Sequence, residues 1–190
     1  MAFELVVIGT SLGGLSALPV VLAGLPKGFS AAVAVVQHRH RVSDLSLSNF
    51  LQQYSVLPLK EAEDKESVLP GHIYLAPADY HLLVEVGSFA LSTEAPVIYA
   101  RPSIDVLFES AADAYAERVI GVILTGASHD GAQGLAAIKA QGGLAVVQEP
   151  TTAESATMPK AALNAVNVDK ILLLSAIAPF LVQVCHPALR

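Results

Sequence analysis

The sequence predicts a doubly wound, mostly parallel α/β fold, with helices on both faces of the β-sheet and an antiparallel β-hairpin insertion. Short, continuous runs of branched apolar residues alternate with segments of helical periodicity in both halves of the 190-residue chain. Such runs are typical of strands buried on both faces of a parallel sheet, and right-handed crossovers leave few other arrangements. Between residues 57 and 91 the runs shorten and turn residues separate them, which favours antiparallel pairing.

The individual elements follow from the local pattern of apolar and polar residues. Buried strands are expected at residues 3–9, 31–36, 119–124, 144–147 and 171–174. Helices are expected at residues 12–22, 45–54, 104–116, 132–140 and 177–184. In the insertion, residues 73–75 and 82–84 are expected to form short strands, and Gly87-Ser88 is expected to close a hairpin.

The composition narrows the class of protein. With 53% hydrophobic and 15% charged residues, the chain can bury one sizeable core, so we expect a single domain over residues 1–190. Its net charge of -6 and its lack of a Lys/Arg cluster argue against nucleic acid as a partner. The six histidines are scattered and Cys185 is the only cysteine, so we expect no metal site and no disulfide framework.

The distribution of apolar residues argues against a membrane protein. The N-terminus lacks a basic region and a convincing signal-peptide cleavage site. Every apolar run is far shorter than the roughly 18 residues that suggest a transmembrane helix. We therefore expect a cytoplasmic protein without membrane insertion.

The first candidate for chemistry is Ser11, in residues 9–14 (GTSLGG), where a strand turns into a helix. In open α/β sheets the binding crevice lies beyond the carboxyl ends of the strands. The glycines permit a sharp turn there, and free N–H groups at the helix start could stabilise an oxyanion. The same turn suits a phosphate, although its spacing matches neither GxGxxG nor GxxxxGK[ST], and no acidic residue ends the second strand to hold a ribose. Ser11 is a candidate nucleophile, with anion or nucleotide binding as the alternative.

Two further candidates follow two other predicted strands. His38 is the first histidine after the strand expected at residues 31–36, and it could take a proton from a serine hydroxyl and return it to a leaving alcohol. His40 competes for this role, and both could be solvated loop residues. Asp130 could orient an imidazole, or it could simply cap the helix expected to begin at residue 132. Together, the three positions favour a Ser-His-Asp hydrolase.

Three segments also resemble the catalytic segments of the chemotaxis protein-glutamate methylesterase family. They are residues 8–14 (IGTSLGG), 36–38 (VQH) and 124–131 (LTGASHDG). Further similar segments are residues 74–77 (YLAP), 80–81 (YH), 101–108 (RPSIDVLF) and 158–162 (MPKAA), so the resemblance spans nearly the whole chain. It implies a doubly wound α/β sandwich with a β-hairpin and no dissociable cofactor. By motif position it implies that Ser11 is the nucleophile, His38 the general base and then acid, and Asp130 the group that orients His38.

The resemblance also implies a reaction and partners. Members of this family hydrolyse glutamate methyl esters on the cytoplasmic region of methyl-accepting chemoreceptors to glutamate and methanol, and some deamidate receptor glutamines. Backbone N–H groups near Leu12 and Ala127 are the expected oxyanion donors. The alternatives are an esterase for another substrate and a catalytically idle module that binds the receptor or a chemoreceptor methyltransferase.

Three features depart from the family pattern. The well-studied members carry a phospho-receiver domain ahead of the esterase, whereas this chain begins at its first predicted strand, so we expect a free-standing domain without phosphorylation control in cis. Leu12 stands where threonine is common. Ala127 and His129 replace the commoner methionine and asparagine, which bears on the oxyanion hole and on substrate preference.

Overall fold

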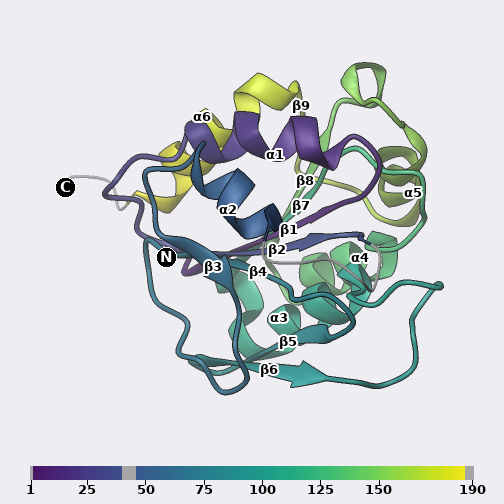
Figure 1. The fold of residues 1–190 in the computed structure, drawn as a ribbon. Helices are drawn as coiled ribbons and strands as arrows, with labels where there is room; N and C mark the ends of the chain where they lie inside the picture. Colours follow the sequence, from purple (N-terminus) through teal and green to yellow (C-terminus); the bar gives the residue numbers. More distant parts are fainter. Residues whose placement is uncertain (1, 40–45, 187–190) are drawn as a thin grey trace.

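One seven-stranded parallel sheet forms the centre of the computed structural model, which describes residues 2–39 and 46–186 (Figure 1). The strand order is β3-β4-β2-β1-β7-β8-β9, and every pair in it is parallel. The strands are β1 (Leu5–Thr10), β2 (Ala32–Gln37), β3 (Leu59–Glu61), β4 (Ile73–Leu75), β7 (Val119–Ile123), β8 (Leu144–Gln148) and β9 (Lys170–Leu172). The predicted doubly wound, mostly parallel sheet is confirmed.

Helices cover both faces of this sheet (Figure 1). One layer contains α1 (Gly14–Ala23), α2 (Ser46–Gln52) and α6 (Leu174–Cys185). The other contains α3 (Ile104–Tyr115), α4 (Ala132–Ala140) and α5 (Thr157–Ala165). A two-stranded antiparallel hairpin, β5 (His81–Glu85) and β6 (Ser88–Ser92), packs against α3 on this second side.

The two cores follow from the two-residue period of the strands. In β1, Leu5 and Val7 belong to the core beneath α3 and α4, whereas Val6 and Ile8 belong to the core beneath α1 and α6. All four side chains are fully buried. A strand buried on both faces needs apolar residues at every position, which is why this segment reads as a continuous apolar run.

The predicted antiparallel insertion is partly wrong. Strand β4 lies inside the main sheet, where it pairs in parallel with both β2 and β3. Only β5 and β6 form the antiparallel hairpin, and its two-residue loop is Val86-Gly87, one residue before the expected Gly87-Ser88. A three-residue run carries too little periodicity to distinguish a buried parallel strand from one arm of a hairpin.

Strand β3 and helix α5 were not predicted, and the predicted helix at residues 45–54 lies partly outside the described residues. Strand β3 is short and half-exposed, and α5 contains Pro159 in its first turn, where proline is tolerated. The helix expected at residues 45–54 appears as α2, and Leu45 lies outside the described residues. Across residues 2–39 and 46–186, no helix is long and apolar enough to cross a membrane.

Candidate active site

The three predicted site segments meet at the carboxyl edge of the central sheet. Ser11 follows β1, His38 follows β2, and the loop of residues 124–131 follows β7. These are neighbouring strands, in the order β2-β1-β7. The crossovers leave β1 and β7 in opposite directions, which makes their junction a topological switch point, where crevices open in such sheets.

A glycine turn holds Ser11 at the start of α1. Gly13 is the N-cap and has a left-handed φ of 86°, and the N–H of Gly14 donates to Ser11 O at 2.9 Å. The N–H of Ser11 donates to Thr125 O at 3.0 Å, which ties this turn to the loop after β7. A Cβ on Gly13 would lie 2.7 Å from Glu154 Cβ, so both the conformation and the space require glycine.

Gln37 joins the serine turn to the histidine strand. Its Nε2 donates to Ser11 O at 2.9 Å and to His38 O at 2.8 Å, and the side chain is buried. A Cβ on Gly14 would lie only 1.8 Å from Gln37 Oε1, so glycine leaves the room that the amide needs. No role for Gln37 was predicted, because only the fold brings its amide within reach of both carbonyl groups.

A short hydrogen bond joins His38 to Asp130. His38 Nε2 lies 2.7 Å from Asp130 Oδ2, and the two side chains are 15% and 0% exposed. An ionised carboxylate can only accept hydrogen bonds, so Nε2 carries the proton in this pair. The neutral ring then leaves Nδ1 free to accept a proton.

Asp130 also caps a helix, although not the expected one. Its Oδ1 accepts from Ser103 Oγ at 2.8 Å and from the N–H of Asp105 at 3.0 Å, and its Oδ2 accepts from the N–H of Ile104 at 2.6 Å. These donors form the start of α3, whereas α4 begins behind Gly131 without a side-chain cap. Capping of the following helix was the wrong alternative, because the chain turns Asp130 toward a helix that precedes it in sequence.

The surroundings of Asp130 favour its charged form. Burial opposes ionisation, but the hydrogen bonds from His38 and from the backbone N–H groups of Asp105 and Ile104 outweigh it and hold the pKa of Asp130 below its ordinary value. The positive end of the α3 dipole acts in the same direction. The carboxylate is therefore available to stabilise a charged imidazole on His38.

Ser11 and His38 are brought near each other through main-chain contacts. The N–H of His38 donates to Thr10 O at 3.0 Å, directly before Ser11. Within residues 2–39 and 46–186, no hydrogen bond joins Ser11 Oγ to a His38 ring nitrogen. The competing histidine, His40, lies outside the described residues.

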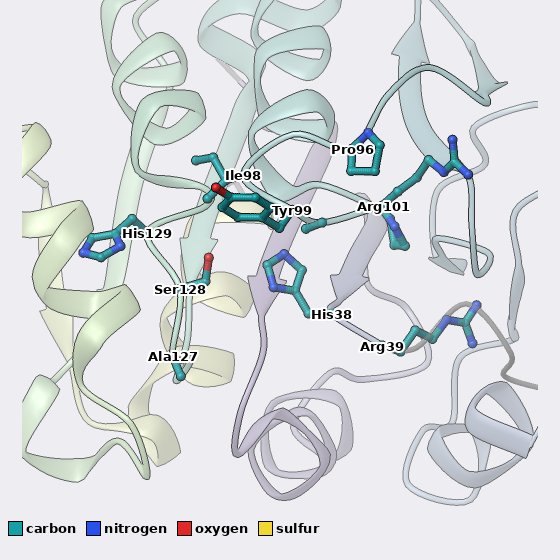
Figure 2. A pocket seen from close by; sticks show the side chains of 11 residues that line it. His38, Arg39, Pro96, Ile98, Tyr99, Arg101, Ala127, Ser128 and His129 are labelled. Carbon is teal, nitrogen blue, oxygen red and sulfur yellow. The ribbon is translucent and has the colours of Figure 1, made fainter.

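A pocket of about 610 Å³ opens beside His38 (Figure 2). Its lining comes from the residues after β2, from the loop after β7 and from the segment that joins the hairpin to α3. The lining residues are His38, Arg39, Pro96, Ile98, Tyr99, Ala100, Arg101, Pro102, Ala127, Ser128 and His129. In the described part of the chain, no group of three or more His, Cys, Asp or Glu side chains could hold a metal ion.

Asp105 is a second buried carboxyl group, next to Asp130. Its Oδ1 accepts from the N–H of Gly134 at 2.7 Å, and its side chain is buried. Burial raises its pKa to about 6, and the negative charge of Asp130 adds to this increase. Because the pKa in the folded state exceeds that of the unfolded chain, ionisation of Asp105 destabilises the fold.

Replacing Asp105 with asparagine is therefore expected to raise the free energy of unfolding at pH 8 by on the order of 2 to 3 kcal/mol. The amide oxygen keeps the acceptor for Gly134 but carries no charge. The gain should shrink as the pH falls through 6, and it should be roughly half as large at pH 5. Urea unfolding at both pH values measures it, with Asp113→Asn on the exposed face of α3 as control. An equal gain at both pH values would contradict titration of Asp105.

Comparison with known proteins identifies the relatives of this chain. The family model of the CheB methylesterase matches residues 6–181. A Leptospira interrogans protein is 47% identical over 184 residues, covering 96% of this chain and 95% of that protein, and its name assigns it provisionally as a protein-glutamate methylesterase/protein-glutamine glutaminase. The crystal structure of the Thermotoga maritima CheB methylesterase catalytic domain matches with a TM-score of 0.91 and 35% identity, covering 96% of this chain and 99% of that one.

Longer relatives carry the same two activities in their names. A protein-glutamate methylesterase/protein-glutamine glutaminase of Anaeromyxobacter dehalogenans is 43% identical over 89% of this chain, and one of Pseudomonas aeruginosa is 41% identical over 95%. The matched regions cover 50% and 54% of those proteins. The chain thus spans about half the length of these two relatives.

Proposed function

Because the chain belongs to the CheB methylesterase family, we propose that it hydrolyses methyl esters on glutamate side chains of a protein substrate by Ser-His-Asp chemistry. The observation that carries the proposal is the 2.7 Å contact between His38 and the buried Asp130. His38 follows β2, and Ser11 follows the neighbouring strand β1. A buried carboxylate that holds an imidazole in one tautomer is the arrangement that a serine nucleophile requires.

The proposed reaction runs through an acyl-enzyme. Ser11 Oγ attacks the γ-carbonyl carbon of a methylated glutamate, and His38 Nδ1 takes the hydroxyl proton. The tetrahedral intermediate collapses, the bond to methoxide breaks, and His38 returns the proton so that methanol leaves. Water, activated by His38, then attacks the acyl-enzyme and releases the glutamate carboxylate and Ser11. Asp130 stabilises the imidazolium in both steps.

The backbone N–H groups of Leu12 and Ala127 are proposed as the oxyanion hole. Neither group takes part in a hydrogen bond among the described residues, whereas the N–H of Ser11 is occupied by Thr125 O. Leu12 lies in the turn before α1, and Ala127 lies in the loop after β7 and lines the pocket. Free donors on two loops around the nucleophile suit a developing negative charge on the carbonyl oxygen.

Deamidation of glutamine side chains is proposed as a second reaction at the same site. The relatives from Anaeromyxobacter and Pseudomonas bear both activities in their names. A glutamine amide gives the same acyl-enzyme as a glutamate methyl ester, and ammonia leaves with the proton from His38 in place of methanol. The proposed protein substrate is the cytoplasmic region of a methyl-accepting chemoreceptor, because glutamate methyl esters occur there in the chemotaxis systems that the family resemblance implies.

The test is methanol release from a methyl-esterified chemoreceptor by the purified chain, together with labelling of Ser11 by phenylmethylsulfonyl fluoride. The proposal expects release in proportion to enzyme concentration and one labelled serine, Ser11, by peptide mass spectrometry. Labelling without release would indicate a serine esterase for another substrate. The absence of both methanol release and Ser11 labelling would contradict the proposal. It would favour an idle binding module or an anion-binding turn.

A further inference from the structure

A strained turn stands at the edge of the pocket beside His38. The N–H of Ala100 donates to Val97 O at 2.8 Å, and the N–H of Val97 donates to Ala100 O at 3.1 Å. The two central residues, Ile98 and Tyr99, have positive φ values of 47° and 63°. Positive φ at both central positions is the mark of a type I′ turn, which favours Asn-Gly.

Isoleucine and tyrosine are costly at these positions. A left-handed backbone brings Cβ close to the carbonyl oxygen, and a β-branched residue is an outlier there. Strain of this kind persists only where the surrounding structure holds it, and it gathers at functional sites. The backbone geometry of the turn therefore does not explain why isoleucine and tyrosine occupy positions 98 and 99.

The neighbouring segment fixes the turn in place. Arg101 Nη1 donates to the carbonyl groups of Thr93 and Glu94 at 2.7 and 2.9 Å, and its Nη2 lies 2.6 Å from Asp79 Oδ1. His81 Nε2 lies 3.1 Å from Ala95 O. These contacts anchor the backbone on both sides of the turn.

The two side chains themselves are left uncovered. Tyr99 is fully exposed, at 101%, and Ile98 is 44% exposed. Both line the pocket, and Figure 2 draws the Tyr99 ring above the His38 and Ser128 side chains in the view. An aromatic ring this exposed at a pocket rim, with its faces uncovered by the described residues, is typical of a binding residue in the absence of its partner.

Most of the basic side chains of the pocket already have carboxylate partners. His38, Arg39, Arg101 and His129 line the pocket, and none of its lining residues is Asp or Glu. His38 meets Asp130, Arg39 Nη2 lies 2.6 Å from Glu61 Oε1, and Arg101 Nη2 lies 2.6 Å from Asp79 Oδ1. Because these pairs neutralise the arginine charges, the exposed apolar surface of Ile98 and Tyr99 is the feature of the rim that suits a partner, and it favours apolar side chains.

We propose that Ile98 and Tyr99 are substrate-specificity residues that receive apolar side chains next to the esterified glutamate of the protein substrate. The inference rests on the proposed function, since it assigns the recognition of that substrate to the turn of residues 97–100. The turn contacts the segment beside the reacting group and takes no part in bond making. Its removal therefore affects turnover of the protein substrate and leaves the reactivity of Ser11 intact.

The test is the double substitution Ile98→Asn with Tyr99→Gly. Asn-Gly suits a type I′ turn, so this variant keeps the loop and should melt at the same or a higher temperature. We expect kcat/KM for methyl-esterified chemoreceptor to fall roughly tenfold or more, chiefly through KM. The rate of Ser11 labelling by phenylmethylsulfonyl fluoride should stay at the wild-type value. The control is Val86→Ala, which changes an exposed apolar residue in the loop between β5 and β6.

Each outcome decides the matter. Unchanged kcat/KM in the double variant would overturn the inference and leave the proposed function standing. A loss of Ser11 labelling together with turnover in the double variant would assign the effect to the catalytic residues and would also overturn it. If the wild-type chain itself shows no labelling and no release, the proposed function fails, and that result is separate from any effect of the turn.

Discussion

Replacing Ser11 with alanine is expected to lower the rate of methanol release by roughly 10⁴- to 10⁶-fold. Alanine removes the oxygen that forms the acyl-enzyme, and the remaining groups can only assist direct attack by water. The fold should be retained, because the hydrogen bonds at this position come from the main chain: the N–H of Ser11 donates to Thr125 O, and Ser11 O accepts from Gln37 and Gly14. The free energy of unfolding should change by less than about 0.5 kcal/mol.

Ser16→Ala is the matched control for this substitution. Ser16 lies in the first turn of the same helix, α1, and its side chain is exposed. The control should hydrolyse methylated receptor at the wild-type rate and should be labelled at Ser11 by phenylmethylsulfonyl fluoride. A Ser11→Ala chain that retains more than roughly a tenth of wild-type turnover would remove Ser11 as the nucleophile.

Asp130→Asn is expected to lower kcat by roughly 10³- to 10⁴-fold. Each carboxylate oxygen of Asp130 accepts two donors, one of them a backbone N–H: Ile104 at Oδ2 and Asp105 at Oδ1. In either orientation, the amide NH2 of asparagine would face a backbone N–H that cannot rotate away. The substitution also removes the charge that stabilises the His38 imidazolium and fixes its tautomer.

The same argument predicts a loss of stability on the order of 2 kcal/mol for Asp130→Asn, because a buried donor at the start of α3 loses its partner. Turnover must therefore be measured on protein shown to be folded by circular dichroism. Ser103→Ala is the matched control, since it removes one neutral donor to Asp130 and leaves the contact with His38. We expect that control to lose less than about tenfold in kcat. If kcat fell equally in Asp130→Asn and Ser103→Ala, Asp130 would act only through packing.

The local pattern of the sequence was sufficient for most of the sheet. Strands β1, β2, β7 and β8 are long, buried runs of branched residues, so their apolar character identifies them without knowledge of their neighbours. Strand β4 was misassigned to the hairpin insertion, because three buried residues do not reveal which strand they pair with. Parallel pairing is a contact between distant segments and leaves little local signal.

Part of the candidate site could likewise be predicted from the sequence, and part depended on the tertiary structure. The sequence by itself predicted Ser11, His38 and Asp130 as candidates, since each follows a predicted strand and a parallel sheet brings all such carboxyl ends to one edge. Only the tertiary structure decided that β2, β1 and β7 are neighbours and that Asp130 meets both His38 and the start of α3. It also gave Gln37 its bridging role and left Tyr99 exposed at the pocket rim. Strand propensity and turn chemistry act over a few residues, whereas strand order, side-chain contacts and burial depend on segments that lie 26 to 115 positions apart in the chain.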